Sequence, residues 1–327
     1  MITENSTVLV TGGAGYIGSH TCKALARAGY LPVVYDSLVR GNAWAVKWGP
    51  LEVGDLMDGE RLRDVLRQYR PVGVIHFAAF AYVGESIQSP LMYYRNNVGG
   101  TMSLLRAMAA EGLARLVFSS TCATYGTPEV NPIREDMPQN PINPYGQSKL
   151  MVERILDDCV QEGSLSAVAL RYFNAAGADI EGEIGEAHDP ETHLIPLALG
   201  AVQGSAPPLT VFGDDHPTPD GTCIRDYIHV TDLADAHVKA LEHANGNQGF
   251  SAFNLGTGTG VSIKDLIHAA QEVTGRKVPF SIGPRRAGDP AALVADPSLA
   301  REILGWSAQH SGLCNILQTA WSWMERR

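Results

Sequence analysis

VLVTGGAGYIG, residues 8–18, is an apolar run followed by a glycine-rich turn and the start of a helix-length segment. Its spaced glycines form a GxxGxxG variant of the dinucleotide-binding turn: Gly12, Gly15 and Gly18. Without Cβ atoms the backbone can approach a pyrophosphate, and the helix N-terminus offers unpaired N–H groups and a positive dipole. A tight turn with no ligand is the alternative reading of such a triplet. We expect a dinucleotide here, contacted also by Tyr16 and Ile17.

Short β-rich runs alternate with helix-length segments through the first half of the chain. We expect strands at 8–10, 32–35, 72–77, 116–119 and 167–171, and helices at 16–28, 59–68, 91–110 and 144–161. This alternation predicts an α/β protein with a Rossmann-like, doubly wound parallel sheet. After Gly177 clustered Pro and Gly predict a smaller, loop-rich C-terminal substrate lobe. We therefore expect a dinucleotide-binding domain at 1–175, to which the chain returns around 225–255, and a second lobe at 176–327.

Two carboxylates follow predicted strands and suit the adenosine half of a dinucleotide. Asp36 comes 18 positions after Gly18, where it can accept hydrogen bonds from ribose hydroxyls and repel a 2′-phosphate. This favours NAD over NADP, with a surface Asp that caps a loop as the alternative. Asp55 follows the third strand, and we expect it to meet the adenine amino group unless it is only a turn residue.

A phenol and an ammonium lie four residues apart, hence on one helix face, at Tyr145 and Lys149. Lys149 can stabilise the phenolate of Tyr145, whose ordinary pKa is near 10, so that it serves as a general base. YxxxK alone is common by chance, but here it follows a dinucleotide turn. Thr121 should emerge at the carboxyl end of a parallel strand and hold the reacting hydroxyl, or else only satisfy its own backbone.

Composition and charge exclude several classes of protein. The formal net charge of -10 argues against binding to nucleic acid or anionic membrane. The N-terminal residues do not form a basic region followed by an apolar run, and no apolar run is long enough to span a bilayer. We therefore expect a cytoplasmic protein. Five scattered cysteines without CxxC spacing are expected to be reduced, and we expect no metal site.

Ordered motifs along nearly the whole chain resemble the extended short-chain dehydrogenase/reductase superfamily and, within it, the UDP-glucose 4-epimerase family. The motifs include TGGAGYIGSH (11–20), HFAAFAYVGES (76–86), FSSTCATYG (118–126), NPYGQSKLMVE (143–153), LRYFNAAGA (170–178), RDYIHVTDLADAH (225–237) and FNLGTG (253–258). The resemblance implies a lobe that retains NAD, a lobe at 176–327 that binds a UDP-sugar, and a homodimer. It also implies that UDP-glucose and UDP-galactose are interconverted.

The resemblance assigns roles to individual residues of this sequence. It implies a catalytic trio of Thr121, Tyr145 and Lys149 and further cofactor contacts by Phe77, Ala78, Asn97 and Tyr172. It places the UDP-sugar against Asn174, Leu194, Phe212, Arg225, Arg286 and Asp289, with Leu293 limiting the room around the sugar C2 substituent. Independently, RRAGD at 285–289 is a short basic segment whose guanidinium groups suit a diphosphate, or else a solvated loop.

Two departures bear on the ligands. Many relatives carry Gly-Leu-Lys where this chain has Ala79-Phe80-Ala81, so one phosphate-neutralising charge is missing. His193 stands where an Asn often contacts the nucleotide sugar. We therefore expect weaker retention of NAD from the missing charge and altered contacts with the sugar from His193.

The expected reaction is transfer of the C4 hydride to NAD while Tyr145 takes the hydroxyl proton, followed by return of both to the opposite face of a 4-keto sugar. A nucleotide-sugar 4,6-dehydratase or decarboxylase begins in the same way, but such enzymes place acids after the catalytic Thr or Ser, and here Cys122 and Ala123 follow Thr121. A non-catalytic NAD-binding protein would be expected to lack Tyr145 or Lys149. The sequence leaves open hexoses, N-acetylhexosamines and the pentoses xylose and arabinose.

Overall fold

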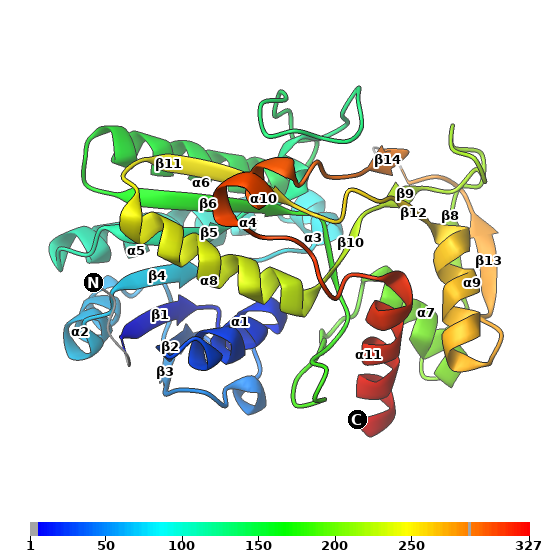
Figure 1. The fold of residues 1–327 in the computed structure, drawn as a ribbon, viewed down its shortest axis with the longest axis horizontal. Helices are drawn as coiled ribbons and strands as arrows, with labels where there is room; N and C mark the ends of the chain where they lie inside the picture. The colour runs from blue at the N-terminus through cyan, green and yellow to red at the C-terminus, as the bar shows by residue number, and fades with distance from the viewer. Residues whose placement is uncertain (1–5, 287–288) are drawn as a thin grey trace.

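A seven-stranded parallel sheet organises the computed structural model, which describes residues 6–286 and 289–327 (Figure 1). Its strands run in the order β3-β2-β1-β4-β5-β6-β11, so the strand order reverses between β1 and β4. Their bounds are β1 (Thr7–Thr11), β2 (Leu31–Asp36), β3 (Leu51–Val53), β4 (Gly73–His76), β5 (Arg115–Ser119), β6 (Ser166–Tyr172) and β11 (Phe250–Leu255). Ligands of open α/β sheets bind where the order reverses. The predicted fold class is confirmed.

Helices cover both faces of this sheet because both faces are apolar. Along β1, Val8 and Val10 belong to one buried cluster with α1 (Tyr16–Arg27) and α8 (Val230–Gly246). Leu9 points to the other cluster, shared with α2 (Gly59–Tyr69), α5 (Gly100–Ala110) and α6 (Pro144–Gln161). Strands buried on both faces are typical of parallel sheets.

The helix that carries Tyr145 and Lys149 begins and ends as the sequence predicts. Asn143 caps it by accepting a hydrogen bond from the Gly146 N–H at 2.8 Å, and Pro144 occupies its first turn. This fixed start determines which face of α6 meets the edge of the sheet.

The predicted helix at 91–110 is interrupted. After α3 (Val83–Gln88), the chain forms α4 (Pro90–Tyr93), one π-helical turn (Tyr94–Gly99) and α5. Asn97, which is 2% exposed, projects from the π turn and bonds to the backbone of Phe80 and to Ser148. Such turns are frequent at functional sites, and apolar periodicity does not reveal them.

The second lobe is built from short paired strands and three helices, at the right of Figure 1. Helices α7 (Leu194–Gln203), α9 (Ile263–Thr274) and α11 (Leu313–Arg326) share one buried apolar cluster. The strand sets are β7 (Asn174–Ala176) with β10 (Tyr227–His229), β8 (Leu209–Phe212) with β13 (Phe280–Gly283), and β9 (Ile224–Arg225) with β12 (Val261–Ser262) and β14 (Ala292–Leu293). Helix α10 (Ser298–Leu304) packs back against α8 and β11. Among the described residues, no helix is long and apolar enough to cross a membrane.

A buried ion pair joins α6 to the sheet behind the predicted catalytic residues. The Arg171 guanidinium on β6 donates to the Glu153 carboxylate at 2.6 Å, and these residues are 5% and 3% exposed. Glu153 also accepts hydrogen bonds from Ser120 and Gln139. The carboxylate therefore ties α6 to the chain just after β5.

We expect Glu153→Ala to lower the free energy of unfolding by about 3–5 kcal/mol, because Arg171 would stay buried and charged without its partner. Asp136→Ala is the matched control, since it removes an exposed pair with Arg134 and should cost under about 1 kcal/mol. Urea unfolding measures both values. Equal small losses would contradict the structural role of Glu153.

Candidate active site

The glycine-rich turn between β1 and α1 is packed against the backbone of its neighbours. A Cβ on Gly12, whose φ is +72°, would lie 2.6 Å from the Ala78 nitrogen, and one on Gly18 would lie 2.3 Å from the Gly12 oxygen. A Cβ on Gly15 would lie 3.2 Å from the Gly12 oxygen and, apart from its chain neighbours, within 4 Å of no other atom of the described residues, so a side chain there would fill the open mouth of the turn. That mouth lies at the N-terminus of α1. A dinucleotide pyrophosphate fits this cradle.

Asp36 lies at the end of β2 and braces the same turn. Its carboxylate accepts hydrogen bonds from the Ala14 N–H at 3.0 Å and the Leu38 N–H at 2.8 Å. Burial raises the pKa of Asp36, against the effect of these two donors. Asp55 is exposed and accepts from the Met57 N–H at 2.8 Å. The ribose and adenine contacts of these carboxylates stay predictions.

The other predicted cofactor residues surround the turn. Phe77 and Ala78 follow β4, and both donate their N–H groups to the Thr11 oxygen, which closes β4 against β1. Ile17, in the first turn of α1, packs against the buried apolar cluster between this helix and the sheet. The Tyr16 hydroxyl donates to the Gly177 oxygen at 2.6 Å, so the turn is bonded to the start of the second lobe.

The structure brings Thr121, Tyr145 and Lys149 together at the carboxyl edge of β5. The Lys149 ammonium is buried, donates to the Ser119 oxygen at 2.7 Å and lies 6.0 Å from the centre of the Tyr145 ring. Burial lowers the pKa of Lys149 to about 7, opposed by the charge of Glu153. Tyr172, another predicted cofactor contact, shares a hydrogen bond with the Ser119 hydroxyl.

Tyr145 holds its proton firmly in this setting. Burial raises its pKa well above the ordinary value, Tyr172 adds to the effect, and a hydrogen bond with Thr121 acts in the opposite direction. With the groups of the protein alone, Tyr145 is therefore a proton donor near neutral pH. Its work as a base requires added positive charge close to the phenol.

The predicted nucleotide-sugar residues form two contacts in the second lobe. The Arg286 guanidinium stacks on the Phe212 ring, 3.9 Å from its centre. Arg225 and Asp289 form an ion pair, and Leu293 on β14 is the register partner of Arg225 on β9.

Two more predicted substrate residues open elements of this lobe. Asn174 starts β7 and donates its N–H to the Asp226 oxygen, next to Arg225. Leu194 starts α7, directly after His193. Within residues 6–286 and 289–327, neither Asn174 nor Leu194 is hydrogen-bonded to Phe212 or Arg225.

Sequence reasoning missed two supporting groups. Ser148 lies between Tyr145 and Lys149, and its hydroxyl accepts a hydrogen bond from the Asn97 amide at 3.0 Å. Glu153, one turn beyond Lys149, raises the pKa of that lysine and anchors α6. The signal for Ser148 was its place inside YGQSK, whereas the partner of Glu153 lies on a distant strand.

Comparison with known proteins places this site in a family. The model of the NAD dependent epimerase/dehydratase family matches residues 8–256. The chain belongs to this family. A UDP-glucose 4-epimerase of Rhizobium leguminosarum bv. trifolii is 54% identical over 97% of both chains. The predicted family, enzyme class and NAD cofactor are confirmed.

Two solved structures share the fold closely. A UDP-glucose 4-epimerase from Brucella ovis in complex with NAD has a TM-score of 0.95 and 57% identity, and the match covers 97% of this chain and 98% of that one. A UDP-glucose 4-epimerase from Stenotrophomonas maltophila with bound NAD and formylated UDP-arabinopyranose has a TM-score of 0.96 and 41% identity, with 98% of each chain covered. The similarity therefore includes both lobes.

We expect Asp36→Asn to lower the ratio of the NADP dissociation constant to the NAD dissociation constant by at least about tenfold, because the negative charge that repels a 2′-phosphate is removed. Asp64→Asn, an exposed change on α2, is the control. Calorimetric titration with each cofactor gives the ratio. If the ratio is the same in both variants, Asp36 is not the ribose partner.

Proposed function

We propose that this chain interconverts UDP-glucose and UDP-galactose by inverting the configuration at C4 of the sugar. The observation that carries this proposal is the placement of Thr121, Tyr145 and Lys149 at the carboxyl edge of β5, two strands from the glycine-rich turn after β1. NAD would be held by the turn at 12–18 and by Asp36. When bound, NAD supplies reversible oxidation of the C4 alcohol to a ketone.

The residues of this chain move the proton of the C4 hydroxyl. The Thr121 hydroxyl orients the sugar oxygen toward Tyr145, whose phenolate form takes the proton and later returns it. The Lys149 ammonium stabilises the phenolate, and the carbonyl of Ser119 fixes the position of that ammonium. Because Tyr145 both takes the proton and returns it, no proton is gained or lost over the whole reaction.

The second lobe holds the UDP part so that the hexose stays free to present either face. The diphosphate would be bound by Arg225 and Arg286, whose present partners are Asp289 and the Phe212 ring. Uracil would replace the guanidinium of Arg286 on the Phe212 ring. Binding therefore exchanges existing contacts for new ones.

Two rival reactions on this fold are disfavoured by the surroundings of Thr121. Thr121 accepts a hydrogen bond from the Ala123 N–H, and burial raises the pKa of the Cys122 thiol to about 12. Neither Cys122 nor Ala123 can supply the acid that dehydratases and decarboxylases use after C4 oxidation. The bound UDP-arabinopyranose derivative of the Stenotrophomonas protein keeps pentose epimerisation as the second candidate function.

We further propose that the protein is a homodimer of cytoplasmic chains. Helices α3, α4 and α6 contact one another and expose large apolar side chains, among them Ile87, Leu91 and Met151. Leu91 is 80% exposed, and a second copy of this face would cover it. The molar mass measured by light scattering tests the dimer.

The proposed cytoplasmic location rests on the cysteines. All five are unpaired, which fits a reducing compartment.

Tyr145→Phe tests the proposed function. We expect turnover of UDP-galactose to fall by at least about 100-fold while NAD affinity and unfolding temperature stay near the original values, because only the proton carrier is lost. Coupled assay of UDP-glucose formation measures turnover. Near-normal turnover would remove Tyr145 from its role.

We expect Lys149→Met to move the acidic limb of the pH–rate profile to higher pH. Burial lowers the pKa of Lys149 to about 7, so the lysine is charged below neutral pH. A charged lysine beside Tyr145 favours the phenolate and would keep the enzyme active at lower pH. Lys277→Met, at an exposed position, should leave the limb in place. An unmoved limb in Lys149→Met would contradict the electrostatic role.

We expect Leu293→Tyr to reduce activity on UDP-N-acetylgalactosamine far more than on UDP-galactose. Leu293 packs against a cluster that contains Cys122, next to Thr121, so a larger ring there would crowd the C2 substituent. A methylene-sized change in such a pocket is worth about 1–3 kcal/mol. Ratios of kcat/KM for the two substrates give the result. Equal losses would favour Leu293 as a core residue behind the pocket.

A further inference from the structure

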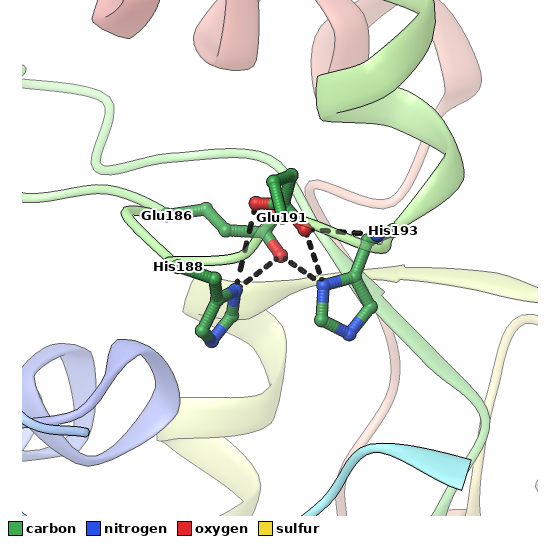
Figure 2. Close-up of side chains that lie close together, drawn as sticks. All are labelled: Glu186, His188, Glu191 and His193. Atoms are coloured by element: carbon green, nitrogen blue, oxygen red, sulfur yellow. Dashed lines mark hydrogen bonds and ion pairs between the residues drawn. The ribbon is translucent and has the colours of Figure 1, made fainter. Parts of the chain in front are cut away.

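Two histidines and two glutamates converge in the segment between β7 and α7, of which the sequence analysis had considered only His193, as a neighbour of the nucleotide sugar (Figure 2). They are Glu186, His188, Glu191 and His193, called here the His/Glu cluster. Both imidazole rings turn their Nδ1 atoms toward the two carboxylates (Figure 2). Glu186 is largely buried, with 8% of its side chain exposed, whereas 43% of the His193 side chain is exposed, so the cluster reaches from the interior to the surface.

The four donor atoms all lie within 4.8 Å of one another, close enough to reach a single metal ion. His193 Nδ1 lies 2.8 Å from both Glu186 Oε1 and Glu191 Oε1, and His188 Nδ1 lies 3.0 Å from Glu186 Oε1 and 3.6 Å from Glu191 Oε2. Zinc bonds of roughly 2.0–2.2 Å separate neighbouring ligands of a regular tetrahedron by roughly 3.3–3.6 Å. The three shorter contacts, at 2.8–3.0 Å, would lengthen as an ion takes the place of the protons between the donor atoms.

The two imidazoles and the two carboxylates pair with one another, but they share their partners. The Nδ1 of an imidazole carries at most one proton, yet His193 Nδ1 faces two carboxylate oxygens at the same 2.8 Å. A cation at the centre would contact both carboxylates and both nitrogens at once. Glu191 is already oriented for this by the backbone N–H groups of Thr192 and His193, which donate to its carboxylate.

A second acidic cluster in the protein shows the contrast. Asp179, Glu181 and Glu183 surround the Lys23 ammonium at 2.5–2.8 Å, so an amine already occupies their centre. Within residues 6–286 and 289–327, the ion pairs of Glu186 and Glu191 are formed with His188 and His193 and with no Lys or Arg. Two imidazoles beside two carboxylates are a donor set that divalent transition metals favour.

We propose that the His/Glu cluster binds one divalent transition-metal ion of zinc's class in tetrahedral coordination. The ion fixes the segment from Glu186 to His193 beside the cofactor turn, because the His188 ring meets the Tyr16 ring edge-on at 6.0 Å and the Tyr82 ring at 6.1 Å. The site is structural, since all four positions belong to the protein, and it is separate from the proton transfer by Tyr145.

The test measures zinc in the full-length protein after treatment with a chelator, addition of excess zinc and extensive dialysis. We expect about one zinc per chain in the original protein and loss of most of it in His188→Ala and in His193→Ala. His268→Ala is the matched control, because His268 forms an exposed pair with Glu272 on α9, and it should keep its zinc. Absence of zinc from the original protein, or its full retention in both cluster variants, overturns the proposal.

Three further measurements test for a thiol ligand, for stabilisation of the native state and for the coordination geometry. Cys314→Ser removes an exposed thiol and should keep the metal, so loss of zinc there would assign the ion to cysteine and overturn the proposal. Zinc should raise the unfolding temperature of the original protein, since a ligand of the native state stabilises it. Cobalt in its place should give the intense visible bands of tetrahedral coordination, whereas the weak bands of an octahedral ion would contradict the proposed geometry.

Discussion

The close approach of the Gly12 backbone to that of Ala78 is the constraint on which the rest of the active site depends. It brings the ends of β1 and β4 together at the point where the strand order reverses, and no residue with a Cβ fits there. The same packing leaves the mouth of the turn open at the start of α1. Asp36 can brace this turn only because β2 lies beside β1 in register, with Val10 opposite Val34.

A second constraint comes from burial at the carboxyl edge of β5. Burial raises the pKa of Tyr145 and lowers that of Lys149, so the proton affinities of the two groups, which are ordinarily similar, move apart. Neither shift suits a phenolate beside an ammonium in the protein alone. The pair therefore depends on further positive charge close to the phenol, which ties proton transfer to cofactor binding rather than to the protein by itself.

Local signals explain how much the sequence predicted. The helix at 144–161 was correct to the residue, because an Asn cap and a Pro mark its start, and the cofactor turn was visible in its glycines. The helix at 91–110 was predicted without its π turn, because apolar spacing does not record a shift of one residue in hydrogen bonding.

Long-range partners could not be predicted from the sequence. The stacking of Arg286 on Phe212 joins residues 74 positions apart, and Arg171 meets Glu153 from another element. The His/Glu cluster was missed for a different reason. Its four members lie within eight residues, but HxxExH in a loop has no helical face to align the donors, and only the fold of the segment brings them together.

The first turns of α1 join the cofactor site to the substrate lobe. Tyr16 bonds to the Gly177 oxygen, and Lys23, two turns further along, forms a buried pair with Asp179 at 2.8 Å. Burial works against ionisation of Asp179, but Lys23 and the Glu183 N–H, which donate to this carboxylate, act together with nearby positive charge to lower its pKa. Because α1 also begins at the glycine-rich turn, one rigid helix positions both the pyrophosphate cradle and the segment that leads into the second lobe. The position of the turn and the position of the segment at 177–179 are therefore set by the same helix.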